Sequence, residues 1–152
     1  MKKSAGLLMY RHGPAGEVQV LLAHPGGPFW RGRDDSAWTI PKGEYLDPEA
    51  AVVAARREFT EETGFEVTPP LLPLGESTQK SGKRLSAWAF RGDCDPARLQ
   101  SNSFETEWPP RSGRRQSYPE IDRVQWFSMA QARRKVLPAQ CDLIDRLEQL
   151  IA

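Results

Sequence analysis

The chain has 152 residues, of which 39% are hydrophobic, and this length and composition fit one globular domain with a full apolar core. Its 21 basic and 20 acidic residues leave a formal net charge of +1, which argues against nucleic acid or an anionic membrane as a partner. No apolar run approaches the ~20 residues of a membrane span, and the N-terminal apolar stretch is too short for a signal peptide. We therefore expect a soluble, cytoplasmic protein.

The N-terminal part of the chain is rich in strand-forming residues. Residues 7–11 and 18–23 form two such runs on either side of a turn that contains Gly and Pro, so we expect two neighbouring strands. Residues 29–36 are predicted to be an exposed loop, and residues 37–40 a short extended segment that ends at Pro41.

A helix is predicted over residues 48–63. Asp47 is a suitable N-cap, Pro48 is a suitable first helical residue, and Gly64 is suited to the position just past the helix end. Its apolar residues share one stripe that can pack on a core: Val52, Ala55 and Phe59.

The remaining chain continues the alternation of strands and helices. Residues 71–79 and 85–91 predict a hairpin, and residues 124–127 predict a last strand. Residues 92–122 predict a long irregular excursion with at most short pieces of structure. Ser128 is a suitable N-cap for a helix over residues 129–136, and Pro138 opens a C-terminal helix. The pattern favours an α/β fold with a mixed sheet and helices on both faces.

Three glutamates at the end of the first predicted helix indicate a cation site. Glu58, Glu61 and Glu62 have helical spacing that brings their side chains together, and such like-charge pairs are destabilising. Gly64 places them in the last turn, where the helix dipole is already negative. A hard divalent ion such as Mg²⁺ or Mn²⁺, which prefers oxygen ligands, would compensate both effects.

The segment from residue 43 to residue 65 carries this helix inside a longer motif. It consists of Gly43, five residues, Glu49, seven residues, and then the run Arg-Glu-Phe-Thr-Glu-Glu-Thr-Gly-Phe. This resembles the Nudix box without a departure. The resemblance covers most of residues 1–152, which we interpret as a single Nudix domain, and it is weakest between residues 92 and 119.

The Nudix resemblance implies an α/β/α sandwich with a mixed β-sheet. It also implies hydrolysis of a pyrophosphate bond in a nucleoside diphosphate linked to another group, with Mg²⁺ or Mn²⁺. Carried over to this sequence, Glu58 and Glu62 are principal metal ligands, Glu61 is a ligand or helps to deprotonate water, and the carbonyl of Gly43 is a further ligand. Arg57 is expected to orient Glu61, the alternative being an exposed helical ion pair.

Acidic residues elsewhere are weaker candidates. Glu49 is interpreted as a solvated acid and not as a ligand. Glu120 is the favoured fourth carboxylate, because resembling enzymes often place a metal-binding or basic glutamate there. Glu105 and Glu107 are rivals, and an ordinary loop glutamate is the alternative.

Aromatic and basic residues are the candidates for substrate binding. Trp30 and Trp108 lie in predicted loops and are favoured for stacking on a nucleobase, whereas Trp38 could be core or site. Lys42 could reach a phosphate or be a surface lysine. The other candidates are Tyr118, Arg115 and the loop cations Lys80, Lys83, Arg84, Arg111 and Arg114.

The expected substrate is a small nucleotide. The entry to the box, residues 38–42, resembles that of Nudix enzymes that cleave dinucleoside polyphosphates, so a dinucleoside polyphosphate or a nucleoside triphosphate is favoured. The alternatives are a pyrophosphohydrolase acting on RNA 5′ ends and a non-catalytic nucleotide sensor. The small net charge argues against RNA.

Overall fold

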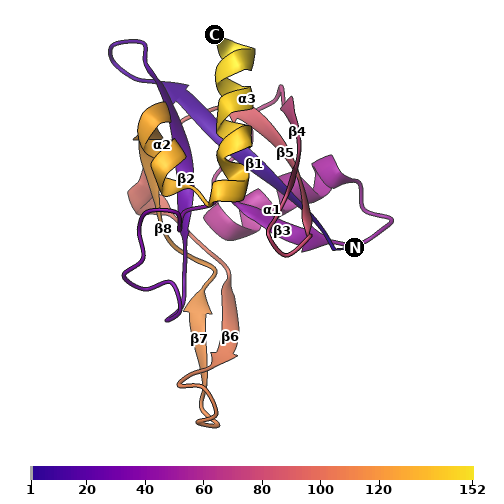
Figure 1. Ribbon diagram of the computed structural model, residues 1–152, viewed down its shortest axis with the longest axis vertical. Helices are drawn as coiled ribbons and strands as arrows, with labels where there is room; N and C mark the ends of the chain where they lie inside the picture. Colours follow the sequence, from indigo (N-terminus) through magenta and orange to yellow (C-terminus); the bar gives the residue numbers. More distant parts are fainter. Residues whose placement is uncertain (1) are drawn as a thin grey trace.

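Strand β1 (Lys3–His12) is the centre of a six-stranded sheet in the computed structural model, which describes residues 2–152 (Figure 1). One edge of β1 pairs in parallel with β5 (Arg84–Arg91), and β4 (Leu72–Thr78) lies outside β5. The other edge of β1 pairs first with β3 (Lys42–Tyr45) and then with β2 (Val18–Pro25), which in turn pairs with β8 (Ile121–Ser128). All pairs except β1 with β5 are antiparallel, so the sheet is mixed.

Both faces of β1 are buried, because its side chains alternate between two cores. Leu7 and Met9 belong to one hydrophobic cluster, whereas Leu8 and Tyr10 belong to the other. A strand at the centre of the sheet therefore requires helices on both sides.

The helices lie in two layers on opposite faces of this sheet. Helix α1 (Ala51–Thr63) packs Ala54, Ala55 and Phe59 into the cluster that contains Leu7. Helices α2 (Met129–Lys135) and α3 (Cys141–Ile151) cover the other face, together with the short 3₁₀ turn η2 (Pro138–Gln140). The 3₁₀ turn η1 (Pro96–Arg98) lies on the α1 side, where the flanking residues Cys94 and Leu99 pack on the same cluster as α1. The predicted α/β/α sandwich with a mixed sheet is confirmed.

The predicted start of α1 is wrong. The helix begins at Ala51, and its N-cap position, Ala50, makes no side-chain cap. Asp47 instead lies 2.7 Å from the Nζ of Lys3, so its carboxylate is used by an ion pair with β1. The predicted end is confirmed: Gly64 has φ of 75° and donates its N–H to the Thr60 carbonyl.

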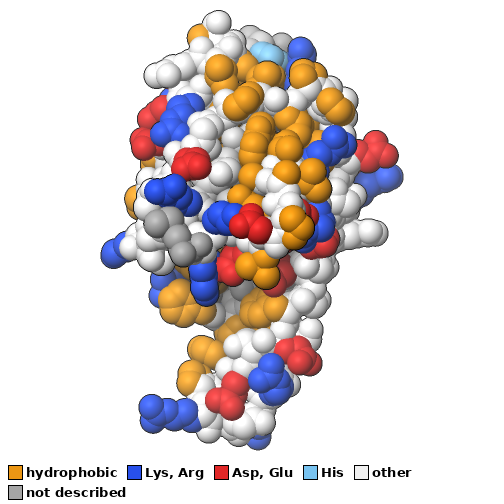
Figure 2. Space-filling view, turned by 90° about the vertical axis from the view of Figure 1, so that its right-hand side faces the viewer, with side chains coloured by type: hydrophobic (Ala, Val, Ile, Leu, Met, Phe, Trp, Pro, Cys, Tyr) orange, Lys and Arg blue, Asp and Glu red, His pale blue; other side chains and the backbone are white. Residues whose placement is uncertain are grey.

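The predicted irregular excursion over residues 92–122 is also partly wrong. It contains β6 (Ser103–Glu107) and β7 (Arg115–Pro119), which form an antiparallel hairpin that projects from the body of the molecule (Figures 1 and 2). The strands expected at residues 7–11, 18–23, 71–79, 85–91 and 124–127 are confirmed with small shifts of their ends.

The C-terminal elements follow the expected signals closely. The Ser128 hydroxyl accepts from the Gln131 N–H, and the Gln131 side chain accepts from the Ser128 N–H, which completes a capping box at α2. Pro138 opens η2, and α3 follows it from Cys141. Within residues 2–152, no helix combines the length and hydropathy needed to cross a bilayer.

Candidate functional site

A cleft opens where β2 and β3 separate from the same edge of β1. This carboxylate cleft, with a volume of 240 Å³, is lined by the segment that enters β3, by α1 and by the residue that precedes β8. Its lining residues are Pro25, Trp30, Thr39, Ile40, Pro41, Lys42, Glu62, Glu120, Ile121 and Leu137. Residues that are far apart in the sequence therefore meet beside the predicted Nudix helix.

Glu62 is the buried acid of this cleft. Its side chain is 9% exposed, and its Oε2 has no hydrogen-bond partner within the described residues 2–152. Burial, followed by the neighbouring charges of Glu58 and Glu120, raises the pKa of Glu62 to about 8, while the charge and backbone N–H of Lys42 oppose the rise. A buried carboxylate oxygen without a partner calls for a proton or a cation.

Glu58 lies directly over β3 because the residue beneath it is glycine. A Cβ built on Gly43 would be 2.0 Å from the carboxyl carbon of Glu58, so no other residue leaves room for this carboxylate. Burial raises the pKa of Glu58 and outweighs the opposing effect of Arg57. Gly43 and Glu58 are 15 positions apart in the sequence, yet the fold brings the two into contact.

Glu120 is the acid outside the Nudix helix that reaches the cleft. Burial raises its pKa, and its charge acts on both Glu58 and Glu62. Of its two rivals, Glu105 lies on the exposed face of β6 near Arg115, and Glu107 accepts from the backbone N–H of Arg111. The geometry therefore favours Glu120 as the fourth carboxylate.

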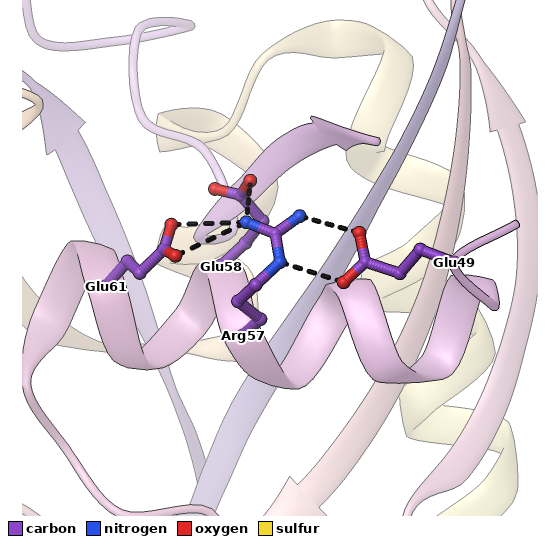
Figure 3. A network of polar contacts seen from close by, with 4 residues as sticks. All are labelled: Glu49, Arg57, Glu58 and Glu61. Carbon is purple, nitrogen blue, oxygen red and sulfur yellow. Dashed lines mark hydrogen bonds and ion pairs between the residues drawn. The ribbon is translucent and has the colours of Figure 1, made fainter. Parts of the chain in front are cut away.

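Arg57 is the centre of an ion-pair network on the outer side of α1 (Figure 3). Its Nε and Nη2 each donate to one oxygen of Glu49, both at 2.8 Å, and its Nη1 donates to Glu58 at 3.0 Å and to Glu61 at 3.2 Å. This bidentate contact corrects the interpretation of Glu49 as a solvated acid, since Glu49 is half-buried against Arg57. Arg57 therefore fixes two of the three helix glutamates.

Two observations test whether this site suits a divalent cation. Across residues 2–152, no three acidic, histidine or cysteine side chains already converge as a complete ligand set. However, Glu62 offers an oxygen without a partner, and Gly43 leaves a cradle for Glu58 that any side chain would fill. With Glu120 nearby, the donor set consists of carboxylate oxygens, which are the ligands that Mg²⁺ and Mn²⁺ prefer.

Residues 100–102 join the end of α1 to the start of β8. The N–H groups of Gln100 and Asn102 donate to the carbonyls of Thr63 and Glu61, which have no partners within the helix. The Glu120 N–H donates to the Asn102 carbonyl at 2.8 Å, and the Ile121 N–H donates to the Ser101 hydroxyl at 3.0 Å. These hydrogen bonds set the position of Glu120 relative to Glu62.

A second cleft, rich in aromatic residues, continues from the first. It has a volume of 510 Å³ and shares Pro25, Trp30 and Glu120 with the carboxylate cleft. One wall is the loop after β2, and the other is the β6–β7 hairpin; the remaining lining residues are Gly26, Gly27, Pro28, Phe29, Phe104, Thr106, Glu107, Trp108 and Pro110. The two walls are closely packed, since a Cβ on Gly26 would be 1.9 Å from the Pro119 carbonyl oxygen.

The predicted substrate-binding residues are divided between this aromatic cleft and other places. Trp30 and Trp108 line the aromatic cleft, and Lys42 lines the carboxylate cleft. Burial lowers the pKa of Lys42, and the nearby Lys83 adds to this effect. The interpretation of Lys42 as a surface lysine therefore does not hold.

Trp38 is part of the core instead. It is 1% exposed, its ring packs edge to face on His24 and Phe127, and its Nε1 donates to Asp34. A ring in this position has no face for a substrate, so its assignment as a binding residue is corrected.

The other predicted cations and Tyr118 lie outside both clefts. Tyr118 packs against Phe104 on the hairpin, and Arg115 is exposed beside Glu105. Arg111 and Arg114 lie in the hairpin turn, and Lys83 and Arg84 pair with Glu44 and Glu76. Lys80 is in the turn between β4 and β5.

Sequence reasoning missed the hairpin wall and the glycines that pack against it. Phe104, Thr106 and Trp108 alternate with polar residues, which is the period of a strand with one apolar face. This alternation was the available signal. The role of Gly26 has no such signal, because it depends on contact with a residue 93 positions away.

The fold and the cleft together define a mixed-sheet sandwich whose glutamate-bearing helix faces a pocket for a ligand. The model of the NUDIX domain matches residues 2–147, so the chain belongs to this family. The resemblance on which the sequence interpretation rests is thereby confirmed.

Solved structures share the fold at low sequence identity. An Ap4A hydrolase from C. elegans, in a binary complex, superposes with a TM-score of 0.67 at 21% identity, covering 99% of this chain and 98% of that one. The NUDIX domain of Shewanella oneidensis NrtR, complexed with ADP ribose, gives a TM-score of 0.63 at 15% identity, covering 99% and 88%.

One curated relative is similar over part of the chain. An RNA pyrophosphohydrolase from Caulobacter vibrioides is 44% identical over 52 residues, which are 31% of this chain and 30% of that protein. The match therefore spans less than a third of the relative's length.

Proposed function

We propose that this protein hydrolyses a pyrophosphate bond in a small nucleotide, with Mg²⁺ or Mn²⁺ as cofactor and residues 1–152 acting as a single domain. The observation that carries the proposal is the continuity of the carboxylate cleft with the aromatic cleft through Pro25, Trp30 and Glu120. Phosphates placed beside Glu62 would leave the base of the same nucleotide between Trp30 and Trp108. Stacking of a base on such rings contributes ~1 to 3 kcal/mol.

Each carboxylate has a role that follows from its position. Glu58, Glu62 and Glu120, with the Gly43 carbonyl, would hold the cation, which when bound neutralises phosphate charge and activates water. Arg57 keeps Glu58 and Glu61 oriented, and Glu61, the most exposed of the helix glutamates, is placed to accept a proton. Lys42 lines the cleft, where its charge favours a phosphate oxygen.

Dinucleoside polyphosphates are the favoured substrate class. The aromatic cleft, at 510 Å³, is large enough for a nucleoside and leaves the carboxylate cleft for the phosphates. The likeness to the Ap4A hydrolase over nearly the whole of both chains supports this choice.

RNA with a 5′ triphosphate is the second candidate. It is supported by the partial match to the RNA pyrophosphohydrolase. The basic residues at the tip of the hairpin are a further reason to test it, although Arg115 lies near Glu105.

A panel of substrates with product identification tests the proposal. Dinucleoside polyphosphates, nucleoside triphosphates, ADP-ribose and a 5′-triphosphorylated RNA are incubated with Mg²⁺ or Mn²⁺, and the products are separated. We expect cleavage of a dinucleoside polyphosphate to nucleotide products, and none with Glu62→Gln. Binding of these ligands without turnover by any metal-loaded sample would instead indicate a nucleotide sensor.

A further inference from the structure

A third cleft lies on the other side of the loop that carries Trp30. It has a volume of 380 Å³, and residues 31–34 of that loop form one wall. Strand β8 and the last residue of α2 form the opposite wall with Asp122, Arg123 and Lys135. The cleft is separate from the carboxylate cleft, because the two have no lining residue in common.

The acidic groups of this cleft are already paired. Asp34 accepts from Lys135 and from the Trp38 Nε1, while Asp122 lies 2.9 Å from the Nδ1 of the buried His24. The pairing of Asp34 lowers its pKa. Asp34 therefore has a cationic partner, and Asp122 is held by its contact with His24.

Lys135 pairs with Asp34 and Asp35, whereas the three arginines of the cleft have no carboxylate partner among residues 2–152. Within the described part of the chain, Arg31, Arg33 and Arg123 have no carboxylate oxygen within 4 Å. Together with Lys135 they give the cleft four basic side chains against two acidic ones. The surplus positive charge is concentrated at one concave place, although the whole chain is nearly neutral.

Two of these guanidinium groups lie over aromatic rings. Arg33 lies 4.3 Å from the ring centre of Phe29, and Arg123 lies 5.1 Å from that of Trp38. This contact restrains each guanidinium without a carboxylate partner, and a guanidinium fork can bind phosphate bidentately. The wall is also anchored, since the Nε2 of His24 lies 2.7 Å from the Arg33 carbonyl oxygen.

We propose that this cleft, formed by Arg31, Arg33 and Arg123, is a second phosphate-binding site. Its ligand is a group with two or more linked phosphates, because one phosphate would leave most of the 380 Å³ and part of the N–H donors unused. Such a group comes either from the far end of a nucleotide substrate or from a free polyphosphate; the first of these sources rests on the proposed function.

Calorimetric titration with inorganic tripolyphosphate, without divalent cations and at one low ionic strength, tests the site. We expect saturable binding to the wild type and to Glu62→Gln, and a loss of about tenfold or more in affinity for the double variant Arg31→Gln with Arg123→Gln. Arg123→Lys keeps the positive charge but lacks the two parallel N–H donors of a guanidinium. Its affinity for tripolyphosphate should therefore lie between those of the wild type and the double variant. Arg91→Gln, which removes an exposed arginine of β5 outside the cleft, is the matched control.

Each result has a defined meaning. Unchanged affinity in the double variant, with a wild-type melting temperature showing that it is folded, overturns the proposal, as does an equal loss in Arg91→Gln. If Arg123→Gln raises the KM for a dinucleoside polyphosphate but not for ADP-ribose, the phosphates bound in this cleft belong to the substrate. If neither KM changes while tripolyphosphate binding is lost, the cleft binds a free polyphosphate. Because the titration needs no turnover, its failure is distinct from failure of the proposed hydrolysis.

Discussion

Glu62 combines burial, a nearby glutamate and an oxygen without a partner among residues 2–152, and this combination distinguishes it from the other acids of α1. Glu61 is nearly half exposed and is bound by Arg57, whereas Glu58 rests on Gly43 and also touches Arg57. The three residues look equivalent in the sequence. Their different surroundings divide them into one acid with an oxygen that has no partner among residues 2–152 and two acids that Arg57 already holds.

Replacing Glu62 by glutamine should abolish turnover while keeping the fold. The amide removes the ligand charge at the floor of the cleft, and we expect a fall in kcat on the order of 10²-fold or more. Steady-state kinetics with Mg²⁺ measure it, and Glu66→Gln, an exposed acid just beyond α1, is the control. Wild-type kcat in Glu62→Gln would contradict the assignment.

The raised pKa of Glu62 predicts a pH dependence of stability in the metal-free protein. Because the folded pKa of about 8 lies above the unfolded value of 4.5, folding favours the neutral acid. This contribution is complete below pH 4.5 and is lost as the pH rises toward 8, with a slope of up to about 1.4 kcal/mol per pH unit.

Denaturant unfolding in EDTA between pH 5 and pH 8.5 measures this dependence. The free energy of unfolding of the wild type should fall with pH relative to that of Glu62→Gln. Parallel curves for the two proteins would show that burial does not perturb Glu62 in this way.

At the scale of elements, the site depends on one glycine in a strand and on one hairpin. Gly43→Ala places a Cβ where the Glu58 carboxylate lies, and the backbone of β3 is fixed by its pairing with β1. We expect kcat to fall at least about tenfold, with weaker Mg²⁺ binding, because Glu58 is displaced. Isothermal titration with Mn²⁺ provides a readout that is independent of turnover; unchanged Mn²⁺ affinity would argue against the cradle.

Removing an aromatic ring from the β6–β7 hairpin should weaken substrate binding without affecting the chemical step. Trp108→Ala removes a ring from the aromatic cleft, so KM for the favoured nucleotide should rise about fivefold to a hundredfold while kcat changes little. Trp88→Phe, outside the cleft, is the control. A fall in kcat at constant KM would contradict a role in base stacking.

Prediction from sequence succeeded where local chemistry decides the structure. Gly64 ends α1 and Ser128 caps α2, because each signal acts on its own backbone neighbours. It failed at Asp47, whose carboxylate is drawn to Lys3 on another strand. It left Trp38 open between core and site, because the burial of that ring depends on packing with Phe127. The acids of the Nudix helix were found by their spacing, whereas the bidentate pairing of Glu49 depends on the late start of α1.

At the scale of the whole molecule, the carboxylate cleft joins the end of α1, the start of β3 and the residue before β8. Three acids from two of these places repel one another, and each has its pKa raised by burial. A cation bound by the folded state alone would relieve this repulsion and stabilise all three elements together.

Mg²⁺ or Mn²⁺ should therefore raise the melting temperature. At a concentration of about 100 times Kd, the gain in stability is about 2.7 kcal/mol, or roughly 5–11 °C for a domain of 152 residues. Calorimetry with and without EDTA measures the shift, and Ca²⁺ serves as a comparison. An EDTA-insensitive melting curve would count against a cation in this cleft.

The chain enters and leaves the projecting hairpin at nearly the same point, where the Glu120 N–H donates to the Asn102 carbonyl. Because this hydrogen bond closes the base, residues 103–119 form an insert whose two ends are already joined. A hairpin of different length or sequence could be grafted there without moving Glu120. The β6–β7 hairpin could then change to accept a different nucleotide, while the acids of the carboxylate cleft stay the same and keep the reaction.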